Sequence, residues 1–238
     1  MLFTLKSYKD LLNLIKRKYV FSTDPSFASE VMLLRHDIDF NLSLAHKMAS
    51  IEHSFEVCTI YLVMVDNPLY DIHSRRSIKL LNEIQSLGHK IGLHYDPLIS
   101  GKCNFEGQIM KLEDAVESEI ILFSRHQPTI YGFDEEINYN NKIDLNLHMT
   151  EFKYMSDSCM KPREDFLSTF EKYSKIQLLI HPEFWMLNSK DLLDFGCKIK
   201  KFQKYKNRKL IDHMVSIMIE TLSNRDELDV KNSKHKFN

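Results

Sequence analysis

Two acidic residues stand close behind a short apolar run in the first part of the chain. Residues 31–34 are all apolar, and a run of this length predicts a buried strand rather than a helix. If the strand continues, Asp37 and Asp39 point to the same side, because side chains two residues apart share a face. Two such carboxylates repel each other unless a cation or a proton separates their charges. The pair therefore indicates metal binding or acid/base chemistry, with an ion pair to Arg35 and a helix cap as the structural alternative.

Histidine and aspartate recur where later strands are predicted to end. β-branched and apolar segments predict strands that end near Asp37, Met64, His94, His126, Asp157 and His181. These positions are about 30 residues apart, the length of one strand–helix unit. Helical periodicity is found at residues 5–19, 42–54, 74–87, 105–118 and 189–223. Strands that alternate with helices predict an α/β fold with a parallel sheet, in which the carboxyl ends of the strands carry the chemistry.

Each of these strand-end residues also has a structural explanation. His94 shares a face with Asp96 but could be a hydrogen-bonded core histidine, by the same alternation. His126 and Asp157 could belong to ordinary loops or helix caps. His181 ends a strand that is otherwise apolar, where a histidine is a poor core residue, so a functional role is favoured there.

The predicted helix ends depend on a few residues. Ser7 and Asn41 are typical N-caps for the first two helices. Gly88 follows the third helix in the position where glycine commonly ends one.

The overall composition favours one folded domain in a reducing compartment. The chain has 238 residues, of which 43% are hydrophobic, and its 32 basic and 33 acidic residues nearly cancel. This balance argues against a nucleic-acid partner, and four cysteines without a CxxC pair argue against a disulfide framework. No segment is predicted to span a membrane or to act as a signal peptide. We expect a cytoplasmic protein with one domain at 1–223 and a polar, flexible tail at 224–238.

At these residues the chain resembles the polysaccharide deacetylase superfamily, which comprises the NodB-homology domains of carbohydrate esterases. The closest resemblance is to divergent members associated with bacterial surface-polysaccharide biosynthesis. Its motifs, in order and within residues 30–185, are 35–39 (RHDID), 88–96 (GHKIGLHYD), 124–128 (SRHQP), 154–158 (YMSDS) and 180–183 (IHPE). The resemblance implies a distorted, incomplete (β/α) barrel of about six to seven parallel strands.

Two motifs depart from the family pattern. The family has two adjacent aspartates in its first motif, whereas Ile38 separates them here. Its second motif is His-x-x-x-His, but Leu98 stands four residues after His94 and cannot coordinate a metal. We therefore expect the third ligand to be His126, with Asp96 as the alternative.

The resemblance implies a metal-dependent hydrolase that removes an N-acetyl group from a sugar, most simply with zinc. Asp39, His94 and His126 are then the metal ligands, although Asp37 and Asp39 could exchange roles. Asp37 is the predicted base and His181 the predicted acid. The resemblance further suggests substrate-binding or tuning roles at Arg125 and Asp157, and sugar stacking at Tyr95 and Trp185. The expected substrate is a sugar, free or linked to a nucleotide or lipid, and the oligomeric state is not predicted.

Two other functions fit the same residues. One is hydrolysis of another amide, such as a formamide or a cyclic imide. The other is a binding protein that keeps the fold without the chemistry. An amidohydrolase proper is disfavoured, because it would need His-x-His on the first strand, which here reads His36, Asp37, Ile38, Asp39.

Overall fold

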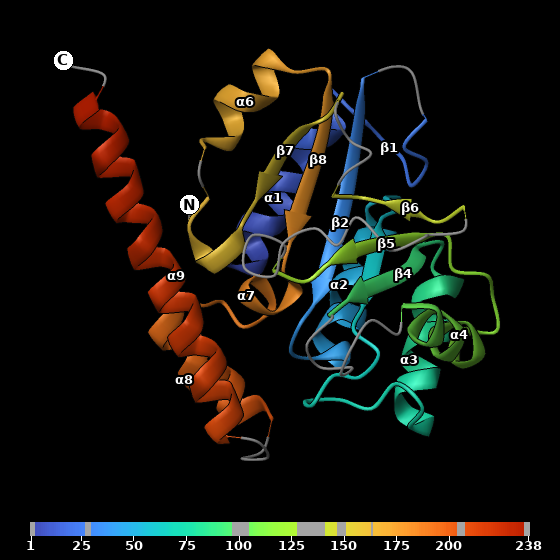
Figure 1. The fold of residues 1–238 in the computed structure, drawn as a ribbon. Helices are drawn as coiled ribbons and strands as arrows, with labels where there is room; N and C mark the ends of the chain where they lie inside the picture. The colour runs from blue at the N-terminus through green and yellow to red at the C-terminus, as the bar shows by residue number, and fades with distance from the viewer. Residues whose placement is uncertain are drawn as a thin grey trace.

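The computed structural model describes most of the chain as a single curled sheet with helices around it (Figure 1). The described residues are 3–26, 30–96, 105–127, 141–146, 151–162, 164–203 and 208–235, with side chains up to residue 225. Leu98, which stands at the family's second histidine position, lies outside them. None of the helices in this part of the chain is both long and apolar enough to cross a bilayer.

All strand pairs in the sheet are parallel, as predicted. The strands are β1 (Val20–Phe21), β2 (Val31–Ile38), β3 (Ile60–Val63), β4 (Lys90–Tyr95), β5 (Leu122–Arg125), β6 (Ile143–Asp144), β7 (Lys153–Ser156) and β8 (Lys175–Ile180). Their order is β6-β5-β4-β3-β2-β8-β7, with β1 pairing beside β2. β6 and β7 end this order without pairing to each other in the described residues, so the sheet curls but does not close. This confirms the predicted α/β fold, a distorted and incomplete barrel.

Helices connect the strands and cover the outer face of the sheet. They are α1 (Leu5–Lys16), α2 (Leu42–Ser54), α3 (Arg75–Ser86), α4 (Phe105–Val116), α6 (Phe166–Lys172), α7 (Pro182–Met186), α8 (Leu192–Phe202) and α9 (Arg208–His235). A short 3₁₀ turn, η1, spans Ser158–Met160. In Figure 1, α1 and α2 lie behind the sheet, and α8 and α9 pack against each other at one side.

Two of the three residues that were predicted to begin or end a helix are confirmed. Asn41 caps α2, because its side chain accepts hydrogen bonds from two backbone N–H groups of the first turn. Gly88 has a φ of +92°, the left-handed conformation in which glycine ends a helix. The predicted cap of α1 is wrong by one turn, since Thr4 is the cap and accepts a 3.1 Å hydrogen bond from the backbone of Ser7.

Several elements were not predicted. The short strands β1 and β6 and the short helices α6 and α7 give little periodic signal. Helix α9 continues to His235, through the segment that the sequence analysis describes as a flexible tail. Residues 208–235 contain neither glycine nor proline, so no residue type there breaks the helix.

The two faces of the sheet have different contents. On β2, Leu33 packs with other inward-facing apolar residues, whereas Ile38 packs against the helices. Strand alternation therefore turns Arg35 and Asp37 toward the inside of the curl and His36 toward the helices. The inner face near the carboxyl ends of the strands is thus the polar one.

A buried carboxylate ties the helices to the outer face. Glu52 on α2 is fully buried and accepts hydrogen bonds from Tyr61 (2.6 Å), Thr59 (2.8 Å) and Tyr8. His36 contacts it at 2.7 Å through Nε2. Because a buried charge is stable only when its partners satisfy it, this network fixes α2 behind the strand that carries the two aspartates.

Gly92 is required by the close approach of two strands. A Cβ added there would lie 2.5 Å from a methyl carbon of Leu62 and 2.6 Å from the backbone oxygen of Leu122, which cannot move freely. We expect Gly92→Ala to destabilise the protein by about 1–3 kcal/mol through overpacking, measured by urea or thermal unfolding. Gly196→Ala is the control, because its Cβ would meet only Val215, at 3.3 Å. Equal losses in the two variants would contradict this explanation.

Candidate metal and proton-transfer site

The carboxyl end of β2 brings two aspartates to the inner face. Asp37 is buried, and its Oδ2 lies 3.5 Å from Nη2 of Arg35 and 3.8 Å from Nε2 of His94. Its Oδ1 is buried and makes no hydrogen bond in the described part of the chain. The ion pair to Arg35, which the sequence offered as an alternative to chemistry, is therefore present together with a carboxylate oxygen that remains available.

Asp39, His94 and His126 come together from three parts of the chain. One ligand atom from each lies within 4.8 Å of the other two. Oδ1 of Asp39 lies 3.4 Å from Nε2 of His94, and it is buried without a hydrogen bond to any residue that the structure describes. One carboxylate and two imidazoles are a usual set of protein ligands for a catalytic zinc ion, which keeps a further position open. The residues therefore fit a divalent metal.

Each of the two imidazoles has a hydrogen-bond partner on its Nδ1 atom. Nδ1 of His94 lies 2.8 Å from Oγ of Ser124, and Nδ1 of His126 lies 2.6 Å from Oδ2 of Asp96. Metal-binding histidines commonly have such a partner on the second ring nitrogen, which fixes the tautomer and the ring orientation. Asp96, the alternative third ligand in the sequence analysis, is placed here to orient His126.

His181 lies on the other side of Asp39, at the end of β8. Its Nε2 is 3.8 Å from Oδ2 of Asp39, and its Nδ1 is 2.6 Å from Oδ1 of Asp157. Burial on its own would lower the pKa of His181, but the charge and hydrogen bond of Asp157 raise it to about 10. The carboxylate of Asp157 thus favours the protonated imidazole, which is the form that can donate a proton.

Asp157 is the residue that orients this histidine. Its carboxylate is fully buried and accepts hydrogen bonds from the backbone and the ring of His181 and from Nε1 of Trp185 (2.8 Å). Of the two roles expected for it, binding substrate or tuning His181, the contacts support tuning.

The charges of the site favour an ionised Asp39. Burial would raise the pKa of Asp39, but the close approach of His94 and the charges of His126 and His181 lower it well below its usual range. Burial would likewise lower the pKa of His126, but its hydrogen bond to Asp96 and the charge of Asp39 raise it. Asp39 is thus in the form that binds a cation.

Three residues that were expected to contact the substrate do not face the metal site: Arg125, Tyr95 and Trp185. Arg125 follows Ser124 on β5 and so faces the opposite side of the sheet, where its Nε donates a 3.1 Å hydrogen bond to Oδ2 of buried Asp144. Arg125 therefore points away from the inner face that carries Asp37.

The two aromatic residues expected to stack on a sugar are both in the core. Tyr95 is 2% exposed and packs edge-on against Phe105, with ring centroids 5.5 Å apart. Trp185 is 0% exposed and packs against Phe3 and Tyr8. Neither ring offers a free face, because alternation on β4 and the turn of α7 direct both toward the helices.

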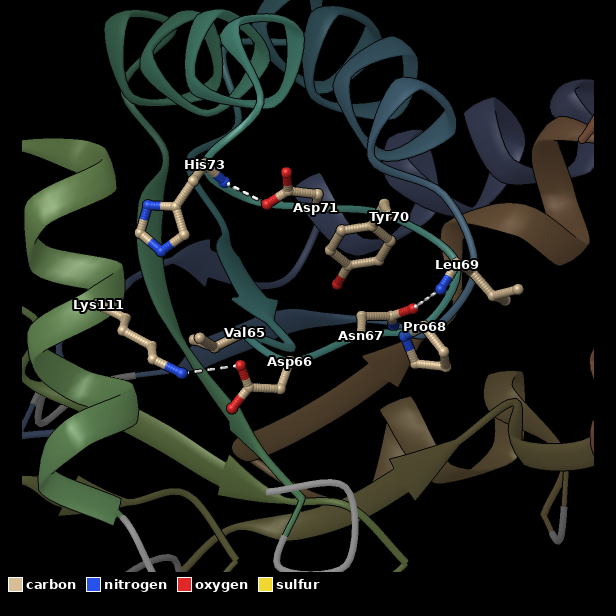
Figure 2. Close-up of a pocket in the computed structure, with 9 residues that line it drawn as sticks. All are labelled: Val65, Asp66, Asn67, Pro68, Leu69, Tyr70, Asp71, His73 and Lys111. Atoms are coloured by element: carbon tan, nitrogen blue, oxygen red, sulfur yellow. Dashed lines mark hydrogen bonds and ion pairs between the residues drawn. The ribbon is translucent and has the colours of Figure 1, made fainter. Parts of the chain in front are cut away.

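A cavity opens in the loop between β3 and α3 (Figure 2), and none of the metal-site or proton-transfer residues described above is among its lining residues. Its volume is about 490 Å³, and it is lined by Val65, Asp66, Asn67, Pro68, Leu69, Tyr70, Asp71, His73 and Lys111. Figure 2 shows the ammonium of Lys111 facing Asp66, with 3.0 Å between their charged atoms. Nδ2 of Asn67 donates a 2.9 Å hydrogen bond to the backbone oxygen of Asp39. The cavity therefore shares its wall with the segment that carries Asp39.

The sequence analysis missed this loop and one further residue, Glu183. Glu183 stands two residues after His181, within the motif that carries the resemblance, and its position in that motif is the only signal for it. Asn67 and Tyr70 gave no signal, since their contacts to β2 depend on the folding of the loop.

Comparison with known proteins gives similarities of structure only. No protein-family model and no curated protein matches the sequence. Two structures of the peptidoglycan deacetylase PdaC from Bacillus subtilis match with TM-scores of 0.46 and 0.45 at 14% identity, covering 88% and 86% of this chain and 98% of the other. A family 4 carbohydrate esterase from Bacillus anthracis matches with a TM-score of 0.39 at 16% identity, covering 90% of this chain and 86% of the other.

Proposed function

We propose that the chain is a metal-dependent hydrolase that removes an N-acetyl or related acyl group from the nitrogen of a sugar. The observation that carries this proposal is the meeting of Asp39, His94 and His126, with Asp37 and His181 on their two sides. Such a site contains a set of metal ligands, a carboxylate with a free oxygen and a protonated imidazole. A metal-assisted hydrolysis of an amide can use these three groups as Lewis-acid site, general base and general acid.

Asp39, His94 and His126 would hold the metal, for which zinc is the best fit to the donor set. A divalent ion bound there would polarise the amide carbonyl and make a water molecule more acidic. The protein's own part is to fix the two rings through Ser124 and Asp96, so that both Nε2 atoms stay directed at the site.

Asp37 is the proposed general base. Its Oδ1 makes no hydrogen bond among the described residues, and its Oδ2 is close to both Arg35 and His94. As a carboxylate, Asp37 would take the proton of the attacking water on this oxygen. The three-residue group includes Asp39 and not Asp37, which supports Asp39 as the ligand and Asp37 as the base.

His181 is the proposed general acid. Asp157 binds its Nδ1, so the proton on Nε2 faces the site and Asp39. When the C–N bond of the amide breaks, this proton passes to the leaving nitrogen, while the proton from water stays on Asp37. The products are a carboxylate, acetate in the simplest case, and a free amino sugar.

We further propose that the substrate is a nucleotide- or lipid-linked N-acetyl sugar of surface-polysaccharide biosynthesis, and that the reaction occurs in the cytoplasm. The sequence motifs support this substrate class.

Metal binding can be tested without a substrate. We expect the purified protein to retain a single divalent ion after dialysis, measured by elemental analysis, and His94→Ala and Asp39→Ala to lose it because each removes a ligand. His46→Ala is the control, since His46 pairs with Glu83 on the protein surface. Metal retained equally by all variants would show that these residues do not bind it.

The two proton-transfer roles can be tested with N-acetyl sugars. We expect Asp37→Asn and His181→Gln each to lower kcat for acetate release by about 10²–10⁴-fold, the usual contribution of a general base or acid, and to leave metal content unchanged. Full activity in either variant would refute its assigned role. If metal binds but no N-acetyl sugar is cleaved, formamides and cyclic imides are the next substrates. Absence of both metal and activity would favour a binding protein.

A further inference from the structure

Glu183 is a buried carboxylate that contacts the backbone directly after Asp39. It lies in the first turn of α7 and is fully buried. Its Oε1 accepts hydrogen bonds from the backbone N–H groups of Phe40 (3.1 Å) and Asn41 (2.8 Å). These contacts join two segments that are more than 140 residues apart in the sequence.

The segment that contains Asp39 is held by side chains from several elements. Tyr70 donates a 2.7 Å hydrogen bond to the backbone oxygen of Ile38, and Asn67 donates one to that of Asp39. Gln203, at the end of α8, donates a 2.7 Å hydrogen bond to the backbone oxygen of Phe40. Tyr70, Asn67 and Gln203 donate to backbone oxygens of this segment, whereas Glu183 accepts from its backbone N–H groups, so these donors do not duplicate its role.

The position of Glu183 also links the two sides of the site. It follows His181 by two residues and shares the rigid start of α7, where Pro182 is the first helical residue. The same short turn therefore fixes the proposed acid and, through Phe40 and Asn41, the backbone of the proposed ligand Asp39. A shift of this turn would change the distance between them, now 3.8 Å from Nε2 of His181 to Oδ2 of Asp39.

We propose that Glu183 is a positioning residue that sets the geometry, and thereby the metal affinity, of Asp39 through the backbone of residues 40 and 41. This inference rests on the metal site of the proposed function. Without the acceptor, the buried N–H of Phe40 and the partly buried N–H of Asn41 lose their partner, and the turn after Asp39 must move to find another. Side chains that hold a metal ligand in place without binding the metal themselves typically change metal affinity by about 10–100-fold when they are lost.

Two substitutions at Glu183 distinguish the effect of its hydrogen-bond acceptor from the effect of its charge. Glu183→Met and Glu183→Gln are both close to glutamate in size, and both remove its charge. Only glutamine keeps an oxygen in the place of Oε1, while its amide group replaces Oε2, which makes no hydrogen bond in the described part of the chain. Glu183→Asp, which keeps the charge but is too short to reach both N–H groups, serves if the methionine variant does not fold.

The first measurement is zinc affinity by competition with a chelating dye. We expect Glu183→Met to weaken binding by about tenfold or more and Glu183→Gln to stay near the wild-type value. The control is Glu52→Gln, a change at a second fully buried carboxylate that accepts several hydrogen bonds on the outer face. It should lower the unfolding temperature without changing zinc affinity.

The second measurement is amide hydrogen exchange at Phe40 and Asn41, in metal-free protein. We expect faster exchange at these two positions in Glu183→Met but not in Glu183→Gln. Unchanged zinc affinity and unchanged exchange in the methionine variant would overturn the inference and leave the proposed function intact. A wild-type protein that binds no zinc would overturn both the inference and the proposed function. If the glutamine and methionine variants weaken zinc binding equally, the inference is also overturned, because the charge of Glu183 and not its hydrogen-bond acceptor would then be responsible.

Discussion

The carboxylate of Asp39, whose Oδ1 is buried, is the group on which the site depends. A buried charge is stable only with partners, and here the partners are imidazoles from three other strand ends, with His94 at 3.4 Å and His181 at 3.8 Å. His126 completes the group of metal ligands. The parallel sheet makes this possible, because all its strands end at the same edge. Each residue of the site therefore needs only a short reach from its own strand.

Each of these imidazoles is oriented by an oxygen on its Nδ1. Ser124 holds His94, Asp96 holds His126, and Asp157 holds His181. The partner is a hydroxyl for His94 and a carboxylate for His126 and His181. The hydrogen bond to Asp96 raises the pKa of His126, and the buried carboxylate of Asp157 raises that of His181 to about 10. His94 and His126 lie in one group with Asp39, whereas His181 stands outside it, so position and not partner charge distinguishes the proposed ligands from the proposed proton donor.

Much of the fold and part of the site could be predicted from the sequence. Residues 31–34 indicated the central strand, Asn41 indicated the start of α2, and the spacing of Asp and His residues indicated a parallel sheet with chemistry at one edge. These are local signals, carried by hydrophobic runs, caps and strand-length repeats. The cap at Thr4 and the length of α9 were missed, because several residues satisfy the same local rule.

The sequence by itself determined which chemical groups stand at the strand ends, since alternation along β2 puts Asp37 on the inner face whatever surrounds it. Only the tertiary structure decided which neighbours are reached. It turned Arg125 outward to Asp144 and buried Trp185 against Phe3. It also brought Glu183 to the backbone of Phe40. The physical reason is that such contacts depend on how the sheet curls and on where helices pack. Both are set by the whole core, so no local pattern in the sequence specifies them.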